Sequence, residues 1–256
     1  MVAPQFAHCI GIRLSRPRRT LDVSGQAAGV GGITILTSPM IPIQDVIPSR
    51  RRPWVTLAII GIMAAVFAWA WAQPAEGIRS VVYGYGWTGP RRWWLFPATA
   101  VLHLGILHAA TNMLALWIFG DTLEDRLGHG RFAALYVLGA LVSWTTVVAT
   151  HPATATTGIG GGGAVAAVIA AYLVQLPRSR VLVLVPLPFF FDLVEIPAAI
   201  VPAFWCLLQI IGVTSAGGGV AAAAQVLWAI GAGGIVGAAV GAVTNRRAVG
   251  WDVPRT

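Results

Sequence analysis

The sequence predicts an all-α, polytopic membrane protein with six transmembrane helices. Hydrophobic residues make up 57% of the 256 residues, charged residues only 10%, and the mean hydropathy is +0.75. A soluble domain carries about 25% charged residues. A bilayer core of about 30 Å requires about 20 apolar residues per helix. Six runs meet this requirement: Trp54–Ala72, Ala98–Phe119, Phe132–Thr150, Gly160–Leu176, Ile196–Val213 and Ala221–Thr244.

The segments outside these runs suggest a simple domain organisation. Residues 1–39 combine several arginines with a stretch rich in Gly, Ala and Ser and contain no run of membrane length. We interpret them as a disordered cytoplasmic extension, with Met40 as an alternative first residue. Residues 40–53 then lead into the membrane domain at 54–244, and residues 245–256 form a cytoplasmic tail.

The distribution of arginine predicts the orientation in the membrane. The chain contains no lysine, and most arginines flank the same ends of the predicted spans. These are Arg50, Arg51 and Arg52 before the first span, Arg126 and Arg131 after the second, Arg178 and Arg180 after the fourth, and Arg246, Arg247 and Arg255 after the sixth; the opposite loops hold Arg79, Arg91 and Arg92. The positive-inside rule therefore predicts a multi-pass protein of the plasma (inner) membrane with both termini in the cytoplasm.

The net charge of +8 has the same explanation. Nucleic-acid binding requires a basic patch or stripe. Here the arginines are spread along the ends of the spans, where they can contact anionic headgroups. We therefore expect membrane lipids as partners and no nucleic acid.

The second predicted span carries three polar side chains, which are costly inside a membrane and usually functional there. His108 and Asn112 are four residues apart and share a face of a helix, whereas His103 points roughly 140° away from His108. Because these histidines diverge and the span has no Cys, Asp or Glu, we expect no metal site and no cofactor. A polar pathway for transport is the alternative, although no span carries a mid-membrane charged residue.

The later elements are predicted from proline and small residues. Val181–Phe191 is apolar but too short to cross and contains two prolines, so we interpret it as a segment at the cytoplasmic interface. Pro197 and Pro202 either bend the fifth span or start it late. Small residues recur every four positions in two spans and predict that the fourth span packs on the sixth. They are Gly163, Ala167 and Ala171 in the fourth span, and Gly233, Gly237 and Gly241 in the sixth.

Over residues 40–247 the sequence resembles the rhomboid intramembrane serine proteases. The resemblance rests on the six spans, the glycine-rich start of the fourth span and a set of spaced residues: His103, His108 and Asn112, then Glu124-x-Arg126-x-Gly128, then Gly233 and Gly237. It implies a serine nucleophile in a Gly-x-Ser-Gly string opening the fourth helix, and a histidine base three residues before the first glycine of the sixth. It also implies that His108 and Asn112 belong to an oxyanion hole.

The serine and the histidine of this dyad are absent. The string falls on four glycines, Gly160–Gly163, so Gly162 stands at the nucleophile position and Ile230 at the base position. There is no serine between residues 144 and 178 and no histidine after His151. We therefore predict a pseudoprotease that binds transmembrane segments of client proteins through a lateral opening between the second and fifth spans.

Two other functions stay open at this point. An active protease could use Ser143 or Thr157 as a non-standard nucleophile, with His103 or His108 as its base. A small transporter or channel could use the polar residues of the second span. For Glu124 and Arg126 we expect a structural role, in which they pair with each other or with backbone to fix the loop after that span.

Overall fold

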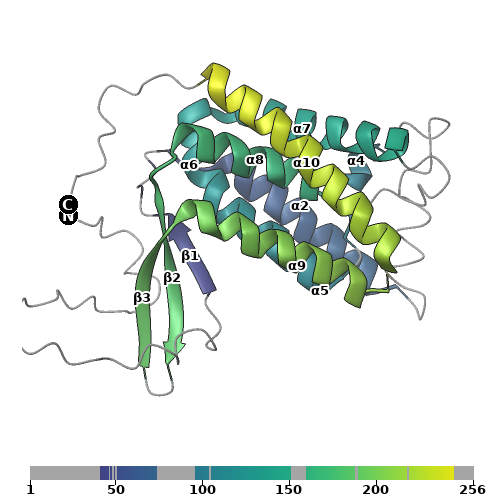
Figure 1. Cartoon of the computed structure of the whole chain (residues 1–256), viewed down its shortest axis with the longest axis horizontal. Coiled ribbons are helices and arrows are strands. Elements are labelled where there is room, and N and C mark those ends of the chain that lie inside the picture. Colours follow the sequence, from purple (N-terminus) through teal and green to yellow (C-terminus); the bar gives the residue numbers. More distant parts are fainter. Residues whose placement is uncertain are drawn as a thin grey trace, which may run out of the picture.

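The computed structural model describes residues 41–45, 47, 49, 51–73, 96–103, 105–150, 160–187, 190–217 and 219–244. Long helices run side by side, and a small sheet lies at one end of the bundle (Figure 1). The molecule is thus mainly helical, as predicted. Residues 1–39 and 245–256, which the sequence assigns to an extension and a tail, lie outside the described residues.

Four predicted spans agree closely with observed helices. The first, third and sixth correspond to α2 (Trp54–Trp71), α7 (His129–Thr150) and α10 (Gly219–Thr244). The fourth corresponds to α8 (Gly162–Gln175), which is shorter. Among the described residues, four helical segments are long and apolar enough to cross a membrane: Trp54–Trp71, His129–Thr150, Ala198–Ser215 and Gly219–Thr244.

The second span differs from the prediction at its start. A short helix, α4 (Phe96–Thr99), is followed by non-helical chain, and α5 begins only at Ile106. From there the helix continues through α5 (Ile106–Ala115), the π-helical η3 (Leu116–Gly120) and α6 (Asp121–Leu127). The prediction of one continuous helix over 98–119 is therefore wrong between the end of α4 and residue 106. Apolar composition alone could not show this, because the break depends on Gly105, whose backbone is extended at φ −157° and ψ 166°.

The segment after α8 forms a hairpin rather than a simple interfacial stretch. β2 (Arg180–Leu187) pairs antiparallel with β3 (Phe190–Pro197), and β1 (Ile41–Asp45) pairs with the other edge of β2. The order in the sheet is β1-β2-β3. Val181, Val183 and Val185 alternate along β2, and such β-branched residues favour strands. The length of the segment and its prolines do not indicate a hairpin, but this alternation of β-branched residues does.

The fifth span starts late, which is one of the two outcomes considered for its prolines. β3 extends to Pro197, a 3₁₀ turn η4 (Ala198–Ile200) follows, and α9 runs over Val201–Ser215. Pro202 lies in the first turn of α9, where its missing N–H breaks no helical hydrogen bond. The predicted start at Ile196 is therefore too early.

α8 lies in the centre of the bundle and packs tightly on α10. Every residue from Gly162 to Ile169 is buried. A Cβ added at Gly233 would strike the carbonyl of Gly163, and one added at Gly237 would strike the carbonyl of Ala167. One at Gly241 would lie 2.9 Å from the Cα of Ala171. The helix contact predicted from the two small-residue stripes is thus present residue by residue, with backbones in direct contact.

The Glu124-x-Arg126-x-Gly128 segment joins helix ends beside the sheet. The Glu124 carboxylate accepts hydrogen bonds from the Val55 N–H (2.9 Å), the Thr56 N–H (2.7 Å) and the Thr56 hydroxyl (2.6 Å), and it also contacts the His129 ring. It therefore caps the N-terminus of α2, where unpaired N–H groups favour a negative charge. Gly128 ends α6 with φ +80°, a conformation that favours glycine.

Arg126 makes a separate connection between helix ends. Its Nε donates to the Gln175 side chain at 3.0 Å, and the Gln175 amide donates to the Thr244 hydroxyl at 3.0 Å. This chain of side chains links the ends of α6, α8 and α10. Of the two pairings considered for Glu124 and Arg126, the structure shows pairing of Glu124 with backbone and, within the described residues, no ion pair between the two side chains.

Burial and hydrogen bonding act in opposite directions on Glu124. Burial raises the pKa of its carboxyl, but the hydrogen bonds from Thr56, Val55 and His129 outweigh burial and hold that pKa below its ordinary value. Glu124 is therefore charged in the folded protein at neutral pH. Its negative charge is compensated by donors at the start of α2.

Candidate functional site

A cluster of buried polar side chains surrounds the N-terminus of α8. His103 precedes α5, His108, Thr111 and Asn112 project from α5, and Gln209 projects from α9. All five are buried, with exposed fractions between 0% and 7%. Polar groups at this depth require partners or a function. This cluster is the candidate site.

His103 lies beside His108, in contrast to the prediction. The two rings are 5.0 Å apart between centroids and meet edge to face. The expected divergence of roughly 140° assumed one continuous helix. Because α5 begins after Gly105, His103 is not on that helix, and the preceding chain folds its ring back onto the site.

Hydrogen bonds determine the tautomer of His103 and the orientation of Asn112. The Nδ1 of His103 lies 3.0 Å from the carbonyl oxygen of Val101, which can only accept, so Nδ1 carries the proton. Its Nε2 then accepts from the Asn112 Nδ2 at 3.0 Å. His103 thereby orients the amide of Asn112.

The glycine string passes directly over His108. Gly160 has φ +102°, and a Cβ there would lie 2.6 Å from the Cε1 of His108. A Cβ on Gly161 would lie 2.5 Å from the carbonyl oxygen of Ala100 and 2.9 Å from the hydroxyl of Tyr136. Both positions therefore require glycine so that the backbone can approach the ring and the start of the second span.

Gly162 has room for a side chain, unlike its neighbours. The nearest atom to a Cβ built there is the Oε1 of Gln209, at an ordinary contact distance of 3.7 Å. Ile230 is partly buried and packs against the core, one residue after Ala229, whose carbonyl lies 2.9 Å from a Cβ built on Gly163. The two positions that the sequence pointed out thus lie at the same level of the bundle. Neither carries a group that can attack a carbonyl or accept a proton.

Gln209 and Thr111 belong to the site although the sequence analysis did not select them. The Gln209 amide donates to the Thr111 hydroxyl at 2.8 Å, which joins α9 to α5. Gly212 allows close contact between the same two helices, since a Cβ there would lie 3.0 Å from the backbone nitrogen of His108. A single glutamine in an apolar span was a usable signal for Gln209. Gln209 was not predicted because it is a single polar residue, whereas the second span carries three polar residues.

Several polar atoms of the cluster have no hydrogen-bond partner within the described part of the chain. They are the Nδ1 of His108, the Oδ1 of Asn112 and the Oε1 of Gln209. Each unsatisfied buried group costs about 1–3 kcal/mol. The cluster can therefore both donate and accept hydrogen bonds toward a bound group.

The other candidate nucleophiles lie differently. The Ser143 hydroxyl donates to the carbonyl of Gly139 at 2.6 Å and is buried against Gly163 and Gly233, where α7, α8 and α10 meet. Thr157 lies outside the described residues. Between described residues, no hydroxyl side chain is hydrogen-bonded to a histidine ring, and no group of three or more His, Cys, Asp or Glu is placed to hold a metal ion.

Comparison with known proteins gives a consistent result. The family model described as Rhomboid domain matches residues 90–247. Presenilin-associated rhomboid-like protein A, mitochondrial, of Danio rerio is 31% identical over 91 residues, which cover 34% of this chain and 24% of that protein. Rhomboid protease GluP of Bacillus subtilis (strain 168) is 43% identical over 49 residues, which cover 19% of this chain and 10% of that protein.

A longer match is found with Putative rhomboid protease YdcA of the same bacterium. It is 27% identical over 128 residues, which cover 48% of this chain and 63% of that protein. The chain thus covers less than two thirds of the length of each of these three relatives. The family match, in contrast, extends over more than half of the chain and includes the whole polar cluster.

Proposed function

Because the chain belongs to the rhomboid family, we propose that it is a member without protease activity that binds transmembrane segments of other membrane proteins. As a family member it is an integral membrane protein. The proposal has two parts, the loss of cleavage and the retention of binding, and different observations support each.

The single observation that carries the first part is the chemistry at the start of α8. The position that the resemblance assigns to the nucleophile is Gly162, and its Cβ direction points to the Gln209 amide rather than to an imidazole. Ile230 stands at the position of the base. Loss of nucleophile or base costs a serine protease about 10⁶ in turnover, which leaves only about 10³–10⁴ over the uncatalysed reaction. Cleavage at that rate has no use in a cell.

The second part rests on what remains around Gly162. His108 and Asn112, the residues similar to an oxyanion hole, are both buried in the cluster, and Asn112 is oriented by His103. Together with Gln209 they offer free donors and acceptors inside an apolar bundle. A client segment with a polar side chain or an unwound turn can supply the missing partners, and each pair then recovers roughly 1–3 kcal/mol.

A route to the cluster is suggested by α5 and α9, which enclose it. In the present structure the two helices are in contact at Gly105, His108 and Gly212. Their outer faces are apolar and open, with exposed fractions of 64% for Ile106 and 43% for Ile211. We propose that a client helix docks on this face and reaches the cluster when α9 moves aside.

Site-specific crosslinking tests the binding. A photoreactive amino acid at Ile211 or Ile106 is expected to capture membrane proteins when the full chain is expressed in its native membrane. The same group at Ile235 of α10, which is 74% exposed, is the matched lipid-facing control. Capture of lipid alone at all three positions would contradict the proposal.

An active protease is the second candidate, because two of the relatives bear the word protease in their names. Incubation of the purified protein with a cleavable membrane-spanning substrate and with a fluorophosphonate probe tests it. We expect neither cleavage nor labelling. Labelling that is lost in Ser143→Ala or Thr157→Ala would overturn the proposal in favour of a non-standard nucleophile. Ion flux in liposomes would instead favour the transporter.

The plasma membrane and a cytoplasmic position of both termini are also proposed, on the distribution of arginine. Several relatives are named as mitochondrial proteins, so the membrane itself has to be determined. The test uses single cysteines in place of Arg178 or Gly217, in a chain without Cys9 and Cys206. On intact cells, an impermeant maleimide is expected to label Gly217→Cys and to leave Arg178→Cys unlabelled.

A further inference from the structure

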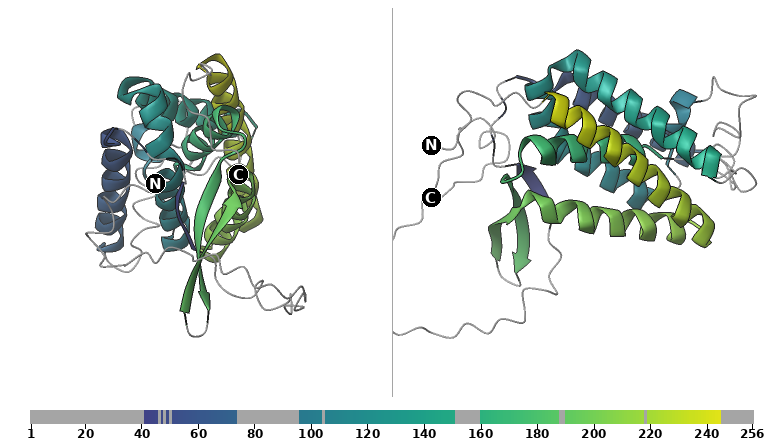
Figure 2. Two further views of the ribbon diagram at one scale, coloured as in Figure 1. Left: turned by 90° about the vertical axis from the view of Figure 1, so that its left-hand side faces the viewer. Right: turned by 45° about the horizontal axis from the view of Figure 1, so that its top comes forward.

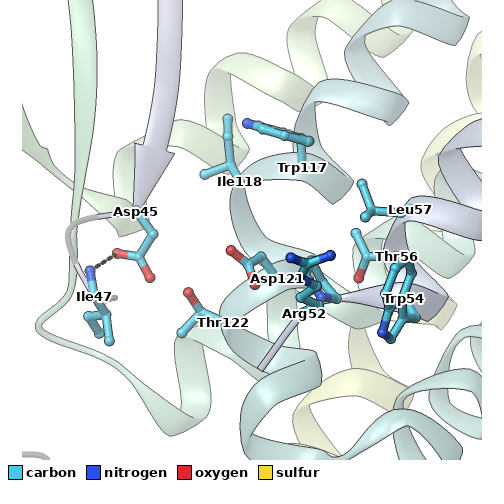
Figure 3. Close-up of a pocket in the computed structure, with 11 residues that line it drawn as sticks. Asp45, Ile47, Arg52, Trp54, Thr56, Leu57, Trp117, Ile118, Asp121 and Thr122 are labelled. Atoms are coloured by element: carbon cyan, nitrogen blue, oxygen red, sulfur yellow. Dashed lines mark hydrogen bonds between the residues drawn. The ribbon is translucent and has the colours of Figure 1, made fainter. Parts of the chain in front are cut away.

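A second candidate binding site lies at the sheet end of the bundle, away from the polar cluster. A pocket of about 340 Å³ opens between β1, the start of α2 and the η3–α6 helix (Figure 3). Its volume lies within the range of small-molecule sites, about 300–1,000 Å³. The residues that carry the argument are Arg52, Asp121, Trp54, Leu57 and Trp117, all of which line it.

The pocket is lined by one arginine, Arg52, and by two carboxylates, Asp45 and Asp121. Arg52 and Asp121 both line it, yet within the described residues no ion pair joins them. The Oδ1 of Asp121 is buried and has no hydrogen-bond partner. The other carboxylate of the pocket, Asp45, already accepts hydrogen bonds from the Ile47 N–H and the Tyr172 hydroxyl. Asp121 is thus the acceptor available to a ligand.

The surroundings of Asp121 favour a positively charged partner. Burial raises the pKa of its carboxyl, the Ser49 side chain acts in the opposite direction, and the nearby charges of Asp125 and Glu124 again raise it, so that the pKa lies above its ordinary value. An ammonium group that donates a hydrogen bond to the free oxygen would relieve this unfavourable environment. Arg52 offers the opposite charge a short way along the same pocket, where Figure 3 shows both side chains.

The walls of the pocket are apolar and continue to the outer surface of the bundle. Trp54 is 59% exposed, Trp117 43% and Leu57 39%. The Arg52 guanidinium lies 5.8 Å from the centre of the Trp54 ring. Tryptophan and arginine at the end of a membrane helix are typical of the headgroup region of a bilayer. A ligand with a zwitterionic head and an apolar tail would match this combination of charges and walls.

We propose that this pocket binds phosphatidylethanolamine, with the lipid phosphate on Arg52, the ammonium on Asp121 and an acyl chain along Trp54, Leu57 and Trp117. The choice of lipid follows from the groups present. A primary ammonium donates hydrogen bonds, whereas the trimethylammonium of phosphatidylcholine cannot reach Asp121 in that way. An anionic lipid would bring no cation to Asp121. The pocket shares no lining residue with the polar cluster inside the bundle, so this inference stands independently of the proposed function.

Lipid titration of the purified full chain in detergent tests the proposal, with binding followed by native mass spectrometry and by the shift in unfolding temperature. The lipids are phosphatidylethanolamine, its N,N-dimethyl derivative, phosphatidylcholine and phosphatidylglycerol with the same acyl chains. We expect affinity to fall about tenfold from phosphatidylethanolamine to phosphatidylcholine, as loss of one charge-assisted hydrogen bond implies. Free phosphoethanolamine is expected to bind far more weakly than the lipid.

Matched variants locate the site. Asp121→Asn is expected to abolish the preference for phosphatidylethanolamine over phosphatidylcholine, and Arg52→Gln to weaken both lipids about tenfold. Asp125→Asn and Arg51→Gln make the same charge changes beside the pocket and should alter affinity by less than about twofold.

Equal binding of the two zwitterionic lipids to the unaltered protein would overturn the proposal, and so would an unchanged preference in Asp121→Asn. If Asp121→Asn fails to fold, two other measurements test the proposal. They are the binding of the methylated lipid series to the unaltered protein and lipid binding by Arg52→Gln, which changes an exposed residue. Tightest binding of phosphatidylglycerol would show a site for anionic lipids instead. Free phosphoethanolamine binding as tightly as the lipid would exclude the acyl-chain contact.

Discussion

At the residue scale, the glycines at the start of α8 differ in whether the structure requires glycine at their positions. Gly160 needs a positive φ, and Gly161 needs a close approach to the Ala100 carbonyl. Gly162 needs neither, because only the Gln209 side chain lies near its Cβ direction. Of these three positions, the one that the resemblance assigns to a serine is thus the one where a side chain fits without displacing backbone. A small side chain would therefore fit at Gly162 in this structure.

The first prediction compares two of these glycines. Gly160→Ala is expected to destabilise the protein by about 2–4 kcal/mol, because the new Cβ adds backbone strain and strikes the His108 ring. Gly162→Ala should change stability by less than about 1 kcal/mol, since its Cβ makes an ordinary contact. Thermal unfolding in detergent micelles measures both. Equal unfolding temperatures for the two variants would contradict the described path of the backbone over His108.

The second prediction concerns the pH dependence of the Glu124 cap. Its folded pKa lies below its unfolded value of 4.5, so its contribution is fully present above about pH 4.5 and disappears as the pH falls through the folded pKa. Glu124→Gln should cost about 1–3 kcal/mol at pH 7, and this difference from the unaltered protein should shrink below pH 4.5.

The control for this experiment is Asp125→Asn, which removes a charge from the next residue of the same helix. The variant His129→Gln measures separately what the contact of His129 with Glu124 contributes to stability. A constant difference between Glu124→Gln and the unaltered protein down to pH 3 would show that the charge of Glu124 does not stabilise the start of α2.

At the element scale, the molecule depends on helices that approach to backbone contact. α8 is buried on almost all sides, while α2 buries only Thr56, Met63 and Ala70, one residue every seven. Figure 2 shows α2 at the edge of the bundle. Without a hydrophobic drive between helices in lipid, close packing has to supply the attraction. The α8–α10 pair does so through glycines on α10, and α2 relies instead on the Glu124 cap.

The third prediction tests the α8–α10 contact. Gly237→Ala would place a Cβ on the backbone of Ala167, so we expect it to destabilise the protein by about 1–3 kcal/mol or more. Gly234→Ala, three residues earlier on the same helix, has no atom within 4 Å of its Cβ and should be neutral or stabilising by about 0.5–1 kcal/mol. Unfolding in micelles compares them. Similar stability of both variants would exclude backbone contact at Gly237.

At the scale of the whole molecule, the bundle has a charged end and a polar centre with separate tasks. Within the described ranges, every Arg, Asp and Glu belongs to β1, the residues before α2, α6, the first turn of α7, the turn after α8 or the hairpin, all at the sheet end (Figure 1). The buried polar cluster lies inside the bundle, where α5, α8 and α9 meet. Side chains of the first region link helix ends, and those of the second include buried polar atoms without a partner among the described residues.

The fourth prediction concerns a double variant that introduces a nucleophile on α8 and a base on α10. Gly162→Ser combined with Ile230→His should bring a hydroxyl and an imidazole together beside His108 and Asn112 and yield measurable cleavage of a membrane-spanning substrate. Each single change should stay inactive, because nucleophile and base act as a unit. Cleavage by either single variant would show that another residue of this chain already supplies the missing group.

Much of this molecule was determined by the sequence alone. Its apolar runs placed α2, α7, α8 and α10 within a few residues, because membrane helices must be about 20 apolar residues long and the periodic glycines mark where two of them touch. The family resemblance also identifies Gly162 and Ile230 as the positions that correspond to a nucleophile and a base. These features depend on composition and local spacing, which a sequence displays directly.

Two kinds of feature became visible only in the folded structure: interruptions of a helix, and contacts between residues far apart in the sequence. A uniformly apolar run does not show where a helix starts, so the placement of His103 beside His108 required the backbone at Gly105. The contributions of Gln209 to the cluster and of Glu124 to the start of α2 bring together residues 98 and 69 positions apart. Such contacts follow from how helices pack and not from any local pattern, and they alone turn a set of polar side chains into a site.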